Sequence, residues 1–86
     1  MPRFLTLQRT IVPHADRARY LARARERTAW YKKAGCRFWV FEEAALPGAF
    51  IEFTEATDRA TLSAAHAGSP EKLLDPKRIY QEVELG

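Results

Sequence analysis

The chain has very little cysteine and no long apolar run. Cys36 is its single cysteine in 86 residues, which excludes an internal disulfide and is consistent with a reducing compartment. No segment approaches the ~20 apolar residues that a membrane-spanning helix needs, and the first residues lack the apolar run of a signal peptide. We therefore expect a cytoplasmic protein that does not span a membrane.

The common signatures of metal and cofactor sites are also missing. The sequence contains no CxxC pair, no HExxH motif, no glycine-rich phosphate-binding loop and no Ser, His and Asp arrangement of a hydrolase. A dedicated metal site and a cofactor are therefore not expected. The 47% share of hydrophobic residues excludes disorder, and a chain of 86 residues can build only one core. Residues 1–86 are thus expected to form a single domain.

The net charge of +3 hides an uneven distribution. Between Ala15 and Ala34 there are seven basic residues and two acidic ones, whereas the rest of the chain has seven basic and nine acidic residues. Such a cluster can attract phosphate or an acidic partner. Because its basic residues circle most of a predicted helix and form no single stripe, a solvated helix surface is the interpretation that we prefer.

The pattern of apolar, capping and turn-forming residues predicts four strands and two helices. They are a strand over Phe4–Val12, a helix from the cap Asp16 to about Ala34, a hairpin within Cys36–Ala56 with Pro47 and Gly48 in its turn, a helix from Thr57 or Asp58 to Gly68, a connector over Ser69–Pro76 and a strand over Arg78–Leu85. With right-handed crossovers, the order β-α-β-β-α-β closes as a ferredoxin-like α+β fold. The antiparallel sheet then has the order 4-1-3-2, with both helices on one face.

Alternation along the strands separates two sets of side chains. A purely apolar set suits the face under the helices, and it consists of Leu5, Leu7, Phe38, Val40, Ile51, Phe53, Ile79, Val83 and Leu85. The other set mixes aromatic and polar residues on the open face, and it consists of Phe4, Thr6, Gln8, Arg37, Trp39, Phe41, Phe50, Glu52, Thr54, Tyr80 and Glu82. Aromatic residues on the open face indicate that a second copy of the chain, a nucleic acid or a small ligand covers it.

One hypothesis is nucleic-acid binding, since RNA-recognition domains share this element order and stack bases on sheet aromatics. The segment from Gly48 to Phe53 is similar to the end of their signature, but Leu46, Pro47 and Gly48 stand at its basic, glycine and stacking positions. Glu52 and Glu82 would also repel phosphate from that face. Nucleic-acid binding is therefore the least favoured of three hypotheses.

The chain resembles the antibiotic biosynthesis monooxygenase-like branch of the dimeric α+β barrel superfamily in its element order, its long first helix and the segment Asp58–Pro70, DRATLSAAHAGSP. The resemblance implies a homodimer in which two open faces close a barrel and each subunit holds a pocket. It implies cofactor-free oxidation, haem handling or cyclisation as the known chemistries. The oxygenases of that branch use an Asn with a Trp and a His, and this sequence contains no Asn. The fold, the dimer and a pocket of unspecified use are what the resemblance supports.

The pocket is expected to be lined by Phe4, Thr6, Arg37, Trp39, Phe41, Phe50, Glu52, Tyr80 and Glu82. Aromatic walls suit a small aromatic or hydrophobic ligand, although Arg37 is expected to pair with Glu52 across neighbouring strands. His66 is the candidate catalytic residue, because imidazole titrates near neutral pH. The sequence leaves open whether the protein is a cofactor-free oxidoreductase, an isomerase, a cyclase or no enzyme at all. The third hypothesis is a non-catalytic structural or regulatory dimer.

Overall fold

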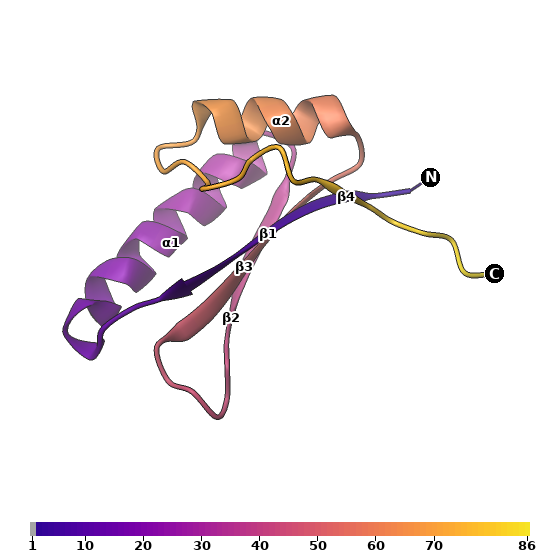
Figure 1. The fold of residues 1–86 in the computed structure, drawn as a ribbon. Helices are drawn as coiled ribbons and strands as arrows, with labels where there is room; N and C mark the ends of the chain where they lie inside the picture. Colours follow the sequence, from indigo (N-terminus) through magenta and orange to yellow (C-terminus); the bar gives the residue numbers. More distant parts are fainter. Residues whose placement is uncertain (1) are drawn as a thin grey trace.

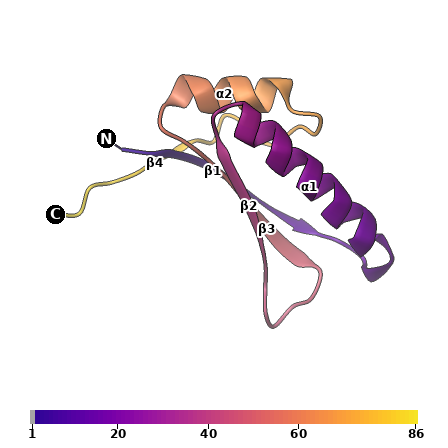
Figure 2. The same cartoon turned by 180° about the vertical axis from the view of Figure 1, so that it is seen from behind.

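The computed structural model describes residues 2–86 and contains one four-stranded antiparallel sheet with two helices on one face (Figures 1 and 2). In chain order the elements are β1 (Phe4–Ile11), a 3-10 turn (His14–Asp16), α1 (Arg17–Lys33), β2 (Arg37–Glu42), β3 (Ala49–Ala56), α2 (Arg59–Gly68) and β4 (Tyr80–Gln81). The spatial order β2-β3-β1-β4 is the predicted one, and it fits a ferredoxin-like fold. In the described residues no helix is long and apolar enough to cross a bilayer.

The helix boundaries follow local chemistry with one exception. Gly35 has a φ of 81°, so it ends α1 in the left-handed conformation that its sequence position predicts. Asp58 begins α2 as a side-chain cap, because its Oδ1 accepts the Thr61 N–H at 2.7 Å. Asp16 was expected to cap α1 in the same way, and this prediction is wrong. It ends the 3-10 turn with helical backbone angles, and its carboxylate accepts from Arg19 instead.

The last strand is much shorter than the predicted Arg78–Leu85. β4 pairs only with the first two residues of β1, and one further backbone bond joins the Glu82 N–H to the Arg3 carbonyl. The chain leaves the sheet after Glu82 (Figure 1), and Val83 and Leu85 are exposed rather than packed under the helices.

The faces of β1 and β3 are the reverse of the prediction. Thr6 and Glu52 point toward the helices, because they bond to His66 of α2 and Arg27 of α1. The same alternation places Phe4, Gln8, Phe50 and Thr54 under the helices and Leu5, Leu7, Ile51 and Phe53 on the open face. Strand β2 has the predicted faces, with Phe38 and Val40 inward and Arg37, Trp39 and Phe41 outward.

The open face is consequently more apolar than expected. Phe53 is paired directly with Leu7 on one side and with Trp39 on the other. Its ring stacks on Trp39 at 5.8 Å between centroids and meets the edge of Phe41 at 5.7 Å. No helix covers this layer (Figures 1 and 2). The helix side of the sheet instead takes Thr6, Gln8, Glu52 and Thr54 of β1 and β3.

The core lies between the sheet and the two helices, around the buried side chains of Tyr31, Phe38 and Leu62. Trp30 lies outside the face of α1 that buries Tyr20, Ala24 and Tyr31. It joins α1 to α2, because its Nε1 donates to the Ala65 carbonyl at 3.0 Å. Cys36 is buried in this core, and burial raises the pKa of its thiol. The core therefore holds both helices in a fixed position over the sheet.

Candidate functional site

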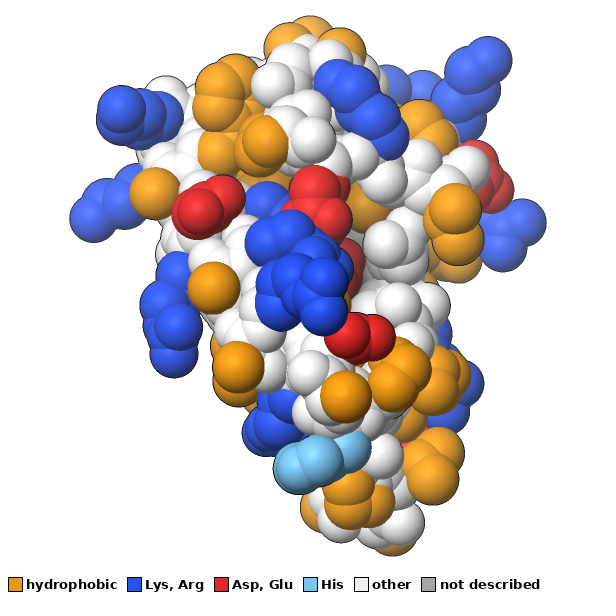
Figure 3. Space-filling view, turned by 90° about the vertical axis from the view of Figure 1, so that its left-hand side faces the viewer, with side chains coloured by type: hydrophobic (Ala, Val, Ile, Leu, Met, Phe, Trp, Pro, Cys, Tyr) orange, Lys and Arg blue, Asp and Glu red, His pale blue; other side chains and the backbone are white. Residues whose placement is uncertain are grey.

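A cavity of about 320 Å³ opens on the side of the molecule where the start of α1 lies near the segment 69–79 that joins α2 to β4, here called the connector. Figure 3 shows that basic and acidic side chains lie side by side at the centre of this surface. Arg19 pairs with Asp16 at 2.7 Å and Arg23 pairs with Glu71 at 3.4 Å. The charges on this cavity are thus largely neutralised by one another.

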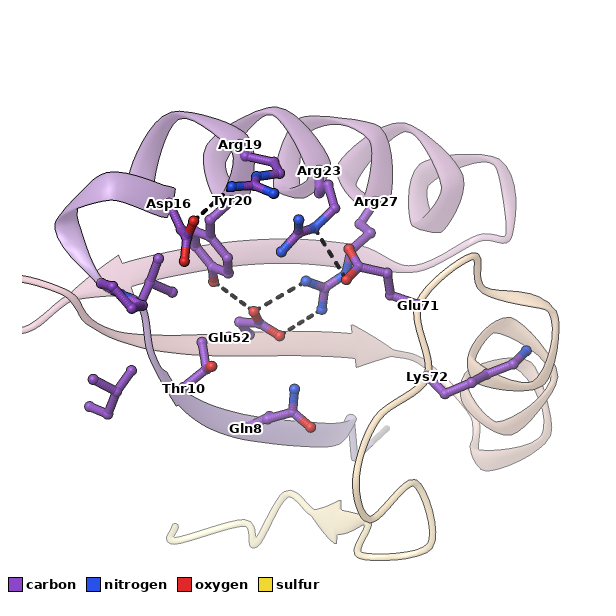
Figure 4. Close-up of a pocket in the computed structure, with 13 residues that line it drawn as sticks. Gln8, Thr10, Asp16, Arg19, Tyr20, Arg23, Arg27, Glu52, Glu71 and Lys72 are labelled. Carbon is purple, nitrogen blue, oxygen red and sulfur yellow. Dashed lines mark hydrogen bonds and ion pairs between the residues drawn. The ribbon is translucent and has the colours of Figure 1, made fainter.

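A buried ionic cluster forms the floor of this cavity (Figure 4). The Arg27 guanidinium donates to both carboxylate oxygens of Glu52, at 2.6 and 3.1 Å, and the Tyr20 hydroxyl donates to the same carboxylate at 2.6 Å. Arg27 and Glu52 are 5% and 3% exposed, so each charge depends on the other for compensation. The pKa of the Tyr20 hydroxyl is raised, mainly by burial and secondly by its hydrogen bond to Glu52.

The helical repeat of α1 and the alternation of side chains along β3 place the residues of this cluster next to one another. Tyr20, Ala24, Arg27 and Tyr31 are spaced by four, three and four residues, so they share the face of α1 that meets the sheet. Glu52 alternates with Phe50 and Thr54 on the inward side of β3, directly opposite Gln8 of β1. The Arg27 guanidinium also lies over the Phe38 ring, 4.8 Å from its centroid.

His66 lies deeper, between both helices and β1. Its Nε2 is 2.7 Å from Thr6 Oγ1 and its Nδ1 is 2.9 Å from Tyr31 Oη. Burial, together with the nearby Arg27 charge, lowers the pKa of His66 to about 4, so the ring is neutral at pH 7. A neutral imidazole has one donor and one acceptor nitrogen, and both are occupied here by hydroxyl groups of the chain. The arrangement is a hydrogen-bonded chain from Tyr31 through His66 to Thr6.

A second and larger cavity, of about 520 Å³, lies between α2 and the connector; we call it the α2 cavity. Its lining consists of Ser63, His66, Ala67, Lys72, Leu73, Pro76, Lys77 and Ile79. The walls are mainly apolar, and they reach the buried His66 on the inner side. The volume falls within the range of small-molecule pockets, which are typically apolar with a few polar groups.

The residues predicted to line one pocket are divided by the sheet. Thr6 lies beside His66, and Phe50 and Glu52 lie against Tyr20, all on the helix side. The other residues predicted for that pocket are Phe4, which packs against the core, and Arg37, Trp39, Phe41, Tyr80 and Glu82, which lie on the open face. The expectation of a single pocket is therefore wrong, because the faces of β1 and β3 are reversed relative to β2.

The expected pairing of Arg37 with Glu52 is also wrong. Arg37 is aligned with Glu55 on the open face, 3.8 Å away, while Glu52 points to the opposite side and binds Arg27. Glu82 is neutralised by Arg3, which donates to its Oε2 at 2.8 Å. Carboxylates of the open face are thus paired with arginines of the same face.

Sequence reasoning missed Arg27, Tyr20 and Tyr31 as members of a polar network. The signal was present, since Arg27 occupies a position of the same stripe as Tyr20 and Tyr31, and a charge there requires a buried partner. Lys72 and Lys77 of the α2 cavity gave no comparable signal, because the connector has no periodic pattern. Among residues 2–86, no group of three or more His, Cys, Asp or Glu side chains could hold a metal ion.

Comparison with known proteins supports the fold. No family model and no curated protein matches the sequence. A solved structure, Rv0793 from Mycobacterium tuberculosis, is similar over 100% of this chain and 97% of its own, with a TM-score of 0.62 and 18% identity. At this identity the likeness shows the fold alone, a small ferredoxin-like α+β architecture, and the finer resemblance to a monooxygenase-like branch stays a prediction.

Proposed function

We propose that the protein is a homodimeric binding protein for a small, largely apolar molecule, which each subunit holds in the α2 cavity. The observation that supports this most strongly is the cavity itself, about 520 Å³ with walls that include Leu73, Pro76 and Ile79. The apolar walls of an empty cavity of this size are exposed to water. A ligand would remove that surface from water, and this removal is the main driving force for binding small molecules.

The dimer is supported by the open face of the sheet. On it Leu7, Phe41 and Tyr80 are 42%, 56% and 45% exposed, and Trp39 and Phe53 complete one contiguous layer. Soluble monomers rarely expose an apolar patch of this kind, and stable interfaces bury about 800 Å² on each partner. No helix covers this apolar layer. When two copies of the chain pack their open faces together, each copy removes the apolar layer of the other from water.

The charges of the open face favour a second copy over a nucleic acid. Three bases, Arg3, Arg9 and Arg37, lie near three acids, Glu43, Glu55 and Glu82, in ion pairs of 2.8 to 3.8 Å. A face with equal numbers of both signs is complementary to itself across a two-fold axis. It offers no excess of positive charge to phosphate.

The proposal assigns no reaction to His66. Both ring nitrogens already bond to Thr6 and Tyr31, so proton transfer to a ligand would require one of these bonds to break first. Binding requires no such rearrangement, because only the outer side of the ring needs to contact the ligand. His66 then acts as part of the inner wall of the cavity.

The ligand site can be tested by NMR titration of ¹⁵N-labelled protein with 2-naphthamide, a neutral planar probe. We expect the largest shifts at the amides of Ser63, Ala67 and Ile79, which line the α2 cavity. Ala67→Phe fills the cavity and should weaken binding at least tenfold. The matched control Ala64→Phe changes an exposed position of the same helix outside the lining and should bind as the unmodified protein does.

Two results would contradict this function. One is the absence of saturable shifts at accessible probe concentrations. The other is a set of shifts centred on Trp39 and Phe41, which would move the binding site to the open face.

A further inference from the structure

We propose that the ligand of the α2 cavity is an organic anion, with an apolar body inside the cavity and a carboxylate at its mouth held by Lys72 and Lys77. This inference rests on the function proposed above and adds the chemical class of the ligand. It follows from the charges of the lining, from their lack of acidic partners, and from the position of the lysines relative to the apolar walls.

The charged residues of the lining have one sign. Lys72 and Lys77 are present, and no Asp or Glu lines the cavity. His66, the remaining titratable group of the lining, adds no charge at neutral pH because its ring is buried and deprotonated. The cavity beside α1 differs, since three arginines and Lys72, which both cavities share, line it together with three carboxylates. The lining of the α2 cavity therefore carries positive charge that no acidic residue of the same lining balances.

The two lysines differ from most bases of the chain in having no acidic partner. Eight arginines form ion pairs with carboxylates within 4 Å, at Arg3, Arg9, Arg17, Arg19, Arg23, Arg27, Arg37 and Arg78. No such pair involves Lys72 or Lys77 in residues 2–86. Both ammonium groups are thus available to a carboxylate supplied from outside.

Lys72 is also oriented toward the cavity. Its side chain extends away from the Glu52 cluster and toward α2 (Figure 4), where Nζ donates to the carbonyl of Ala67 near the end of the helix. This carbonyl occupies one of three N–H groups of the ammonium, so two remain for a ligand. The bond fixes the position of the positive charge at one edge of the cavity, next to the lining residue Ala67.

The distribution of exposure separates an apolar interior from a cationic rim. Leu73 and Ile79 are half-buried and His66 is buried, whereas both lysines are exposed. A ligand with a planar or aliphatic body fits the interior, and its carboxylate would meet the ammonium groups at the solvent edge. Such partly exposed charge-assisted bonds contribute modestly, so selectivity for the anion of about tenfold is expected from two lysines.

Two probes of nearly the same shape test this inference. 2-Naphthoate and 2-naphthamide share the ring system and differ in charge, and calorimetry gives the dissociation constant of each. We expect 2-naphthoate to bind about tenfold more tightly, with a preference that shrinks as the salt concentration rises. The double variant Lys72→Gln/Lys77→Gln should lose this preference, chiefly because it binds 2-naphthoate more weakly. The control Lys32→Gln removes an exposed lysine of α1 outside the lining and should keep the preference.

The outcomes distinguish this inference from the function on which it rests. Equal affinity for the two probes, with shifts in the α2 cavity, would overturn the anion and keep the cavity as a binding site. A preference that survives in the double variant would also overturn it, because the charge would then lie elsewhere. Failure of both probes to bind would remove the proposed function together with the inference.

Discussion

The stability of the fold should depend on pH through one buried histidine. His66 is 3% exposed, and its neutral ring bridges Thr6 and Tyr31. Its ordinary pKa is 6.5, and in the folded protein burial and the charge of Arg27 lower it to about 4. Between these two pH values the unfolded chain holds a proton on His66 that the folded chain does not.

The sign and the magnitude follow from proton linkage. Because the unfolded state binds the extra proton, the free energy of unfolding rises with pH between about 4 and 6.5, and the contribution of His66 is fully present above 6.5. Lowering the pH from 7.5 to 5.0 should cost about 2 kcal/mol, at 1.36 kcal/mol for each unit of pKa difference. The carboxylates with lowered pKa values, Glu42, Asp58 and Glu82, contribute mainly below this window.

Urea unfolding at pH 7.5 and 5.0 measures this loss. The variant His66→Gln should be less stable than the unmodified protein at pH 7.5 but should show little further loss at pH 5.0. The control His14→Gln changes an exposed histidine of the β1–α1 loop and should keep the full pH dependence. An unmodified protein equally stable at both pH values, or a His66→Gln variant with the same pH dependence, would refute the neutral, buried state of this ring.

Two further predictions concern groups that hold the helices on the sheet. Glu52→Gln should leave the Arg27 charge without compensation and cost about 3–5 kcal/mol of unfolding free energy, as measured by urea unfolding. The double change Glu52→Leu/Arg27→Met removes both charges and should cost much less. Equal losses for the two variants would contradict a coupled ion pair. Gly68→Ala should displace Trp30, because a Cβ at residue 68 would lie 2.8 Å from Cζ2 of Trp30. We expect a shifted tryptophan fluorescence and a loss of about 1–3 kcal/mol of unfolding free energy. An unchanged spectrum and an unchanged stability would show that the two helices tolerate a wider separation.

The order of elements could be predicted because each boundary has a local signal. Gly35, Asp58 and the Pro47-Gly48 turn end or begin elements through their own backbone and side-chain chemistry, and the sheet order follows from right-handed crossovers. The faces of β1 and β3 could not be predicted by the rule that the most apolar set faces the helices. That rule ignores Arg27, whose place in the buried stripe of α1 makes Glu52 an inward residue.

Of the residues predicted for the site, His66 lines the α2 cavity and Glu52 lines the cavity beside α1, so they do not form one pocket. His66 stands out by residue type, but its partners depend on a tertiary arrangement of α1, α2 and β1 that no local pattern encodes. The α2 cavity is lined largely by a connector without periodicity, so neither its apolar walls nor Lys72 could be assigned in advance.

The oligomeric state shows whether a second copy of the chain covers the open face of the sheet, on the side opposite the helices and the α2 cavity. Light scattering on the dilute protein should give twice the 9.9 kDa mass of one chain. Trp39→Glu places an unpaired carboxylate on the open face and should give a monomeric or unfolded protein, while Ala64→Glu, on the exposed side of α2, should remain a dimer. A mass of 9.9 kDa for the unmodified protein, or a dimer that Trp39→Glu leaves intact, would show that no second copy packs on the open face.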